Sequence, residues 1–340
     1  MWKVILSLSL VIVLCSCTKN DGYKAPMFPI EKELKGTCLS SELMITYAYD
    51  MCVDDKFIYV LALADDKWVQ VYDRQTGEHL GAFVGQGQGP GEVSVGESIT
   101  LIPNAQRLSV YDQAQRRLVV YKVLDSENSP ILSFEKDLNF IKWEGAVRNV
   151  WPLENSLLVN GQLGEQDGAP KRFQLLHENE IVSAYNEFPI ETKEKQMVFL
   201  SPKVCFTPSM NKMATGILYG GILEIFDLSD NDISLEGIHK FYEPKVNLGS
   251  GSINPESGMK YGFSSMCATE DFIYTVLIGD EDPNKLNHLS VFDWSGKGVA
   301  KYHTTQLLFK LACVEGEEGK LYALTFEPAK GFSLYMYHVQ

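Results

Sequence analysis

The sequence predicts an all-β fold, a six-bladed propeller whose blades each hold four antiparallel strands. Beyond residue 30 no stretch keeps an apolar period of about 3.6 residues, so long amphipathic helices are not expected. Short runs rich in Val, Ile, Leu, Tyr and Phe alternate instead with Gly, Asp, Asn and Pro turns. A decapeptide that begins at Met51 also returns at Met266 with Cys, Phe, Ile and Tyr equally spaced. Such internal repetition is typical of propellers and solenoids.

The strand patterns divide the chain into six modules of similar length. The modules span residues 47–84, 97–136, 145–188, 202–243, 262–304 and 308–340. In each we expect an inner strand, two central strands and an outer strand. The turn before the outer strand is the clearest signal, as in Asp73 to Gly77 and Asp293 to Gly296. Asp opens such a turn through its side chain, and Gly supplies the positive φ that closes it.

The last module shows only three strand patterns, and a closed ring needs a fourth strand. The three patterns are Leu307–Val314, Lys320–Phe326 and Phe332–Val339. The segment Ile30–Leu39 is the natural donor of the fourth, because a strand from the other terminus removes the exposed sheet edges. One propeller over residues 30–340 then leaves no room for a second domain.

The N-terminus has the pattern of a targeting segment. A short positive start at Lys3 precedes an apolar run from Val4 to Leu14, too short to span a bilayer. The run ends in Leu14-Cys15-Ser16-Cys17, which resembles the bacterial lipobox. We therefore expect a lipoprotein signal peptide over residues 1–16, acylation of Cys17 and a polar tether over residues 17–29. An ordinary secretory signal and an uncleaved anchor are the alternatives.

Composition excludes some classes of partner. The chain carries 30 Lys+Arg against 44 Asp+Glu, a formal net charge of −14. Nucleic-acid binders need a basic surface that neutralises phosphates, so nucleic acid is not an expected partner. Electrostatic docking on an anionic membrane surface is disfavoured for the same reason. Contact with a membrane should come through the lipid anchor alone.

Several short motifs together resemble a known family. In order along the chain they are the lipobox, Gly85-Gln86-Gly87-Gln88-Gly89-Pro90-Gly91-Glu92, Tyr219 to Asp227, Val291 to Gly296 and Lys320 to Leu324. This set is similar to the TolB-like six-bladed β-propeller lipoproteins of Bacteroidetes. The resemblance implies an outer-membrane lipoprotein on the periplasmic face or at the cell surface. It implies no settled biochemical activity and no catalytic residue.

The remaining motifs favour scaffold over chemistry. The Gly-rich run at 85–91 lacks the Gly-Lys-Ser/Thr ending of a phosphate loop and should connect two blades. Gly249-Ser250-Gly251-Ser252 is expected to be a linker. Four cysteines should occupy equivalent inner strands as small packing residues: Cys52, Cys205, Cys267 and Cys313. No Cys or His spacing suggests a metal site, so no cofactor is expected.

One weaker pattern is a candidate ligand site. Arg148, Lys203, Lys260 and Lys310 each lie near the start of an expected inner strand, and such starts line one mouth of a propeller channel. Four cations there would attract anions to an otherwise acidic molecule. Trp143, Trp151 and Tyr261 could add an aromatic rim, although burial between blades is the alternative for them.

These observations predict a non-catalytic binding module whose ligand is a protein, a peptide or a glycan. Because fold alone does not establish function, a second class stays open. It is a metal-dependent hydrolase, lactonase or lyase with its site in the central channel. That class would need acids or histidines from several strand starts to converge on the axis.

Overall fold

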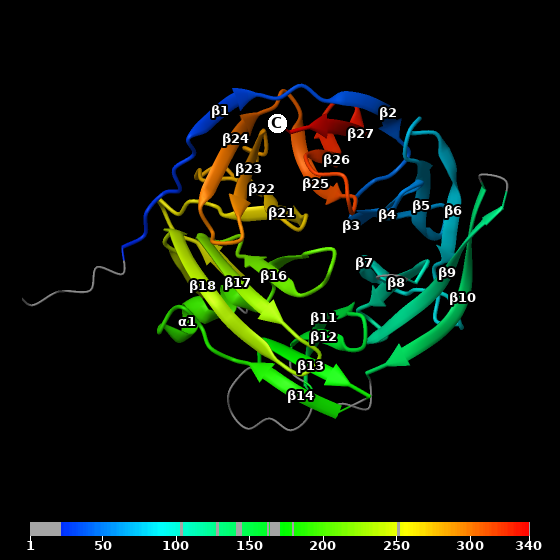
Figure 1. The fold of residues 1–340 in the computed structure, drawn as a ribbon, viewed down its shortest axis with the longest axis horizontal. Coiled ribbons are helices and arrows are strands. Elements are labelled where there is room, and N and C mark those ends of the chain that lie inside the picture. The colour runs from blue at the N-terminus through cyan, green and yellow to red at the C-terminus, as the bar shows by residue number, and fades with distance from the viewer. Residues whose placement is uncertain are drawn as a thin grey trace, which may run out of the picture.

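The computed structural model describes residues 22–102, 105–126, 129–140, 145–161, 163, 171–178, 180–249 and 252–339. Figure 1 shows these residues as a ring of six blades around a common axis, with the strands of each blade stepping outward. The predicted six-bladed β-propeller is therefore confirmed. Expected and observed blades coincide because each strand is a short apolar run that alternates between two faces.

The first three blades each hold four strands in chain order, paired antiparallel. Blade 1 consists of β3 (Asp50–Val53), β4 (Phe57–Ala64), β5 (Lys67–Asp73) and β6 (His79–Gly85). Blade 2 consists of β7 (Gly96–Ile102), β8 (Arg107–Asp112), β9 (Arg117–Ser126) and β10 (Ser129–Asn139). Blade 3 consists of β11 (Val147–Pro152), β12 (Leu157–Gly161), β13 (Phe173–His177) and β14 (Glu180–Tyr185).

The last three blades continue the ring. Blade 4 consists of β15 (Lys203–Phe206), β16 (Lys212–Gly216), β17 (Gly221–Leu228) and β18 (Ile233–Tyr242). Blade 5 consists of β21 (Phe263–Ala268), β22 (Phe272–Leu277), β23 (His288–Asp293) and β24 (Gly298–His303). Blade 6 consists of β25 (Leu307–Cys313), β26 (Lys320–Glu327) and β27 (Gly331–His338).

The N-terminal segment closes the ring, but through two strands. β2 (Thr37–Leu43) pairs antiparallel with β27 and supplies the missing outer strand of blade 6. β1 (Ile30–Glu33) pairs parallel with β24 and adds a fifth strand to blade 5. The expectation of one closing strand over Ile30–Leu39 was therefore correct only in its second half. Figure 1 shows the segment following the outer rim of both blades, so it covers two exposed edges.

The core consists of apolar clusters between neighbouring blades. The cluster that joins blades 6 and 1 contains Met51 and Ile58 from blade 1 and Leu324 and Phe332 from blade 6. Leu43, at the end of β2, is 8% exposed and belongs to the same cluster. The closing strand thus contributes apolar burial as well as backbone pairing.

A buried ion pair joins blades 3 and 4. Arg172, fully buried just before β13, donates through Nη1 and Nη2 to Glu224 of β17 at 2.9 and 2.5 Å. The guanidinium also lies within 5.1–5.6 Å of four aromatic ring centres. This bidentate geometry satisfies both oxygens of the Glu224 carboxylate, while the buried Arg172 Nε has no hydrogen-bond partner among the described residues.

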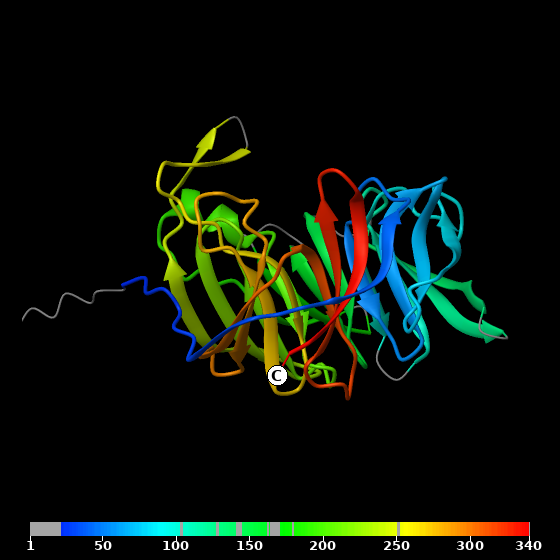
Figure 2. The same ribbon diagram turned by 90° about the horizontal axis from the view of Figure 1, so that it is seen from above.

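Two insertions were not expected from the sequence. α1 (Lys193–Gln196) and a 3₁₀ turn (Met197–Phe199) connect blades 3 and 4, and a hairpin of β19 (Val246–Gly249) and β20 (Ser252–Pro255) connects blades 4 and 5. Figure 2 shows this hairpin, in yellow, projecting from one face of the ring. Of the linker predicted at residues 249–252, the ends Gly249 and Ser252 pair across this hairpin instead, and residues 250 and 251 fall outside the described ones.

The part of the expected tether that the structure describes lies against the propeller. The Lys24 N–H donates to the Lys240 carbonyl at 2.9 Å, and the Phe28 ring contacts Phe292 edge-on at 5.4 Å. The signal peptide and Cys17 fall outside the described residues. Within the described chain, no helix has the length and apolar character needed to cross a bilayer.

Replacement of Leu43 tests the role of the closing strand. We expect Leu43→Ala to lower the free energy of unfolding by about 2–4 kcal/mol, since it opens a cavity between blades 6 and 1. The adjacent Met44 is 91% exposed, so Met44→Ala should change stability by less than about 0.5 kcal/mol. Urea unfolding measures both, and an equal effect of the two substitutions would contradict this role.

Candidate functional site

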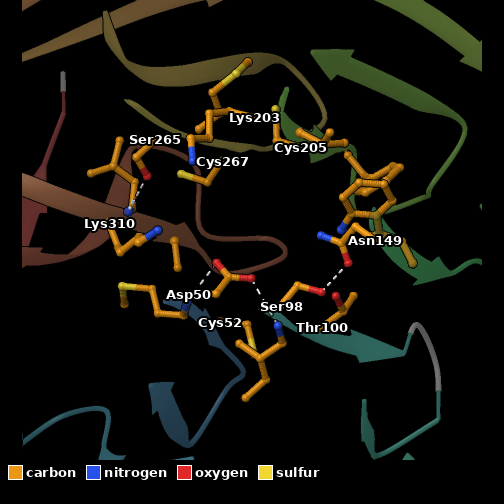
Figure 3. A pocket seen from close by; sticks show the side chains of 18 of the residues that line it. Asp50, Cys52, Ser98, Thr100, Asn149, Lys203, Cys205, Ser265, Cys267 and Lys310 are labelled. Carbon is orange, nitrogen blue, oxygen red and sulfur yellow. Dashed lines mark hydrogen bonds between the residues drawn. The ribbon is translucent and has the colours of Figure 1, made fainter. Parts of the chain in front are cut away.

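A cavity of about 420 Å³ lies on the propeller axis. All six inner strands contribute to its wall, namely β3, β7, β11, β15, β21 and β25. This volume is within the range of small-molecule sites in proteins. Figure 3 shows polar side chains of these strands pointing into the space, with sulfur atoms beside them.

The alternation of a β-strand explains which side chains reach the cavity. Residues two apart share a face, so a lining cysteine marks the residue two positions before it as lining as well. The pairs are Asp50 and Cys52 in β3, Lys203 and Cys205 in β15, and Ser265 and Cys267 in β21. In β25 a register shift between Leu308 and Lys310 breaks this spacing, and both Lys310 and Cys313 line the cavity.

Two lysines form a cationic side of the cavity. Figure 3 shows Lys203 and Lys310 near one another, with Ser265 beside them. Burial, and to a smaller extent the Lys203 ammonium, lower the pKa of Lys310 to about 8. Asp50 and Glu97 oppose this shift without cancelling it. A lysine whose charge is destabilised in this way would be stabilised by an additional anion.

Asp50 faces these lysines but is held by the backbone. Its Oδ1 accepts the Met51 N–H at 2.9 Å, and its Oδ2 accepts the Ile99 N–H at 3.1 Å. The carboxylate therefore ties β3 to β7 at the start of both strands. Burial raises the pKa of Asp50, whereas Lys310 and these hydrogen bonds lower it in part. Desolvation likewise raises the pKa of Glu97 on the neighbouring strand.

Neutral polar groups complete the wall. The Ser265 Oγ accepts the Leu311 N–H at 3.0 Å and so couples β21 to β25. Asn149 Oδ1 accepts the Ser98 hydroxyl at 2.5 Å and the Val150 N–H at 2.8 Å. These bonds use the oxygen of Asn149, and they leave its amide NH₂ available to a ligand.

The four inner-strand cysteines occupy the positions predicted for them. All line the cavity, and each is a free thiol. Burial raises the pKa of Cys52, Cys205 and Cys313 well above the ordinary value, so these thiols stay protonated near neutral pH. Protonated buried thiols are poor nucleophiles and poor metal ligands.

Aromatic rings lie at the same end of the cavity as the lysines. Tyr49 lines the cavity, and Tyr47, 51% exposed, packs edge-on against it with ring centres 4.9 Å apart. Tyr47 also contacts Phe309, the neighbour of Lys310, at 5.6 Å. This rim does not consist of the expected residues. Trp151 lines the cavity but is 8% exposed, and Trp143 lies outside the described residues.

The structure brings together three of the four cations expected at the channel. Arg148 lines the cavity with the two lysines, and its Nη1 donates to the Ser201 Oγ at 3.4 Å. Lys260 and Tyr261 are not among the lining residues. The Lys260 ammonium lies 5.4 Å from the centre of the Tyr242 ring. Tyr261 forms a bridge with Tyr219 outside the blades, because β21 begins only at Phe263.

Sequence reasoning missed Ser98, Asn149, Ser265 and Tyr47. The phase of the cysteines could have identified Ser265, which stands two residues before Cys267. In β7 and β11 no cysteine marks the lining positions. The residue two positions after Ser98 is Thr100, and the residue two positions after Asn149 is Trp151. Tyr47 precedes the strand, and its place at the rim follows from packing alone.

The described residues contain no group of three or more His, Cys, Asp or Glu side chains arranged to hold a metal ion. The carboxylates of the cavity come from β3 and β7 only, apart from Glu315 after β25. The polar wall therefore offers mainly donors: ammonium, guanidinium, hydroxyl and amide groups. Such a wall is suited to an acceptor-rich or anionic ligand.

Replacement of Lys310 tests the cost of its burial. A depressed lysine pKa means that the protonated side chain destabilises the fold below pH 8. We expect Lys310→Met to raise the free energy of unfolding by roughly 1–3 kcal/mol at pH 7. The difference in free energy of unfolding between Lys310→Met and the wild type should shrink as the pH rises from 8 towards 10, because Lys310 of the folded wild type then loses its positive charge. An advantage that does not change with pH would contradict this explanation.

The chain is similar in fold to several solved propellers. An exported protein from Bacteroides fragilis matches with 12% identity, 92% of this chain and 99% of its own covered, and a TM-score of 0.58. A member of the DUF4221 family from Bacteroides vulgatus matches with 8% identity, 91% and 99% coverage and a TM-score of 0.53. Regucalcin from Agrobacterium tumefaciens, described as calcium-binding, matches with 10% identity, 92% and 97% coverage and a TM-score of 0.52.

At these identities the solved structures support the fold alone. No curated protein sequence matches the chain. The model of a family described as TolB-like 6-blade propeller-like does match, over residues 27–313. This range covers five blades and the whole inner strand of the sixth, well over half of the chain. The chain therefore belongs to the TolB-like six-bladed propeller family.

Proposed function

We propose that this protein is a lipid-anchored binding module of the cell envelope, which holds its ligand in the axial cavity and does not transform it. The observation that carries the proposal is the cavity itself, since it gathers donors from several strands of a closed ring. Among the described residues, no serine, threonine or cysteine of the cavity donates a hydrogen bond to a His, Asp or Glu side chain that could act as its base. A peptide end or a glycan would supply acceptors for these donors.

The envelope location is supported by the sequence and by the relatives. The first seventeen residues have the lipobox pattern that ends at Cys17. One of the similar structures is described as an exported protein of a Bacteroides species. We propose an outer-membrane lipoprotein that faces the periplasm or the outside. The membrane is then a partner through the acyl chains, and the net charge of −14 disfavours nucleic acid.

A metal-dependent hydrolase, lactonase or lyase is the second candidate. It is favoured by the fold similarity to regucalcin, which is described as calcium-binding. In this cavity the carboxylates are Asp50, Glu97 and Glu315, and the first two interact electrostatically with both lysines of the same wall. Both oxygens of Asp50 already accept backbone N–H groups. The binding proposal accounts for these cations, whereas a metal site would be opposed by them.

A substitution that fills the cavity tests where binding occurs. Thr100 lines the wall and points into the space in Figure 3. The probes would come from a glycan and peptide array, applied to the soluble Cys17→Ser form. We expect Thr100→Trp to abolish binding of any array member that binds that form. Thr192→Trp, at an exposed position where the side chain makes no cap hydrogen bond, should leave the affinity unchanged.

Melting temperatures of both variants confirm that they remain folded. A ligand that binds the Thr100→Trp variant with undiminished affinity would place the binding site elsewhere. Metal analysis of the purified protein decides between the two candidates. One equivalent of a tightly held divalent ion, together with turnover of a lactone or ester, would establish the hydrolase instead.

Acylation of Cys17 is a separate prediction. In a bacterial host fed an alkyne-tagged fatty acid, the full-length protein should become labelled and partition with membranes. Cys17→Ser should lose both properties, because serine offers no thiol for the diacylglycerol. Cys15→Ser is the matched control and should remain labelled. Labelling that depends on Cys15, or on neither cysteine, would contradict the proposed processing site.

A further inference from the structure

The two ammonium groups of the cavity lack a carboxylate partner in the described protein. None of the ion pairs formed among the described residues includes Lys203 or Lys310. The Lys310 Nζ lies 5.6 Å from the centre of the Phe309 ring. Two half-buried cations on one wall repel one another, and the lowered pKa of Lys310 reflects burial first and this repulsion second.

The nearby acids do not neutralise this pair. Asp50 would have to break hydrogen bonds to Met51 and Ile99 before it could turn towards either lysine. Such charge-assisted bonds to backbone N–H groups are strong, and they also join β3 to β7. Glu97 interacts with both lysines over distance and forms no ion pair with them in the described structure. The ammonium groups of Lys203 and Lys310 are therefore available to pair with an anionic group of a ligand.

A hydroxyl donor stands beside the two lysines. Because the Ser265 Oγ accepts the Leu311 N–H, its own O–H is free to donate into the cavity. Figure 3 places Lys203, Ser265 and Lys310 on one side and Asn149 with Ser98 on the other. A carboxylate between the lysines would receive two charge-assisted hydrogen bonds and one from the hydroxyl. The Asn149 amide would then meet a second acceptor of the same ligand across the cavity.

The rim indicates what the carboxylate is attached to. Tyr47 is half-exposed and edge-packed on Tyr49 and Phe309, so its ring is fixed while one side faces solvent. Fixed exposed aromatic rings next to a polar site offer a flat apolar surface to a ring-shaped ligand body. Both a sugar ring and an aromatic ring present such a face.

We propose that the channel mouth recognises an organic acid, a carboxylate borne on a ring, with the carboxylate held by Lys203, Lys310 and Ser265 and the ring against Tyr47 and Tyr49. This assignment rests on the proposed function, because it names the ligand class of the same cavity. Uronic acids and aromatic acids share this chemistry, and the experiment below distinguishes them.

The proposal has a pH dependence that follows from the groups around Lys310. These are Lys203 on β15, Asp50 on β3, Glu97 on β7, Arg148 on β11, and the thiols of Cys267 and Cys313 on β21 and β25. An organic carboxylate is ionised above about pH 5, so its own titration does not interfere near neutrality. Affinity should be constant around pH 7 and fall above pH 8, where unliganded Lys310 loses its proton.

Matched acid and neutral probes test the assignment. Glucuronate is compared with glucose, and phenylacetate with phenylacetamide, by NMR titration of the soluble Cys17→Ser protein. For at least one pair we expect the acid to bind at least tenfold more tightly and to shift amide signals of β15 and β25. The pair that shows this preference identifies the ligand as a uronic or an aromatic acid. Lys203→Met and Lys310→Met should each weaken that binding roughly ten- to a hundredfold.

A charge-matched control separates local recognition from net charge. Lys32, exposed on β1 at the outer rim, is remote from the cavity, and Lys32→Met should leave the affinity unchanged. Equal affinities of acid and neutral probe in both pairs, or no binding by either acid, overturn the carboxylate assignment. A loss of affinity in Lys32→Met equal to that in Lys203→Met or Lys310→Met overturns the assignment as well. Binding of a neutral ligand that Thr100→Trp abolishes would still support the cavity as the ligand site.

Discussion

The pairing of β2 with β27 is the constraint on which the rest of the molecule depends. An open array of six sheets would leave a sheet edge at each end and no fixed axis. Once β2 completes blade 6, blades 6 and 1 share one apolar cluster, which Leu43 also enters. The six inner strands must then converge, and their first residues meet around one mouth. The site therefore results from ring closure and not from any local motif.

Convergence on an axis determines which residues can be accommodated there. Inner strands crowd one another, so small side chains such as the four cysteines fill the middle of the channel. At the mouth there is room for longer chains, and two lysines and an aspartate occupy it. Asp50 stabilises the scaffold through two backbone N–H groups, whereas Lys310 costs stability in the free protein. Functional sites commonly retain such unfavourable groups because the ligand compensates for them.

Much of the fold could be predicted because its signals are local. Each strand alternates within a few residues, and many of the turns carry an Asp or a Gly, so the sequence predicts the six modules without long-range information. The closing segment was only partly predicted, because the sequence of Ile30–Glu33 does not reveal that its partner is β24 of blade 5. The β19–β20 hairpin was missed because its strands have only four residues each.

Fewer features of the site than of the fold could be predicted, because the site depends on where each strand begins and on packing between distant parts of the chain. The sequence predicts Lys203 and Lys310 as site residues because each lies near the start of an expected inner strand, and both line the cavity. Lys260 was chosen by the same rule and lies elsewhere, because the strand begins three residues later, at Phe263. Tyr47 could not be found at all, since its position depends on packing against Phe309 from the opposite end of the chain.

At the channel mouth, the half-buried Lys310 ammonium forms no ion pair with a carboxylate of the described residues. The most direct test of this unpaired charge is an NMR titration of lysine side chains labelled with ¹³C at Cε, with the Lys310→Met spectrum used for assignment. The account predicts that Lys310 titrates near pH 8, well below the ordinary value of about 10.4. A Lys310 that titrates above pH 10 would show a solvated or paired cation, and would contradict the claim.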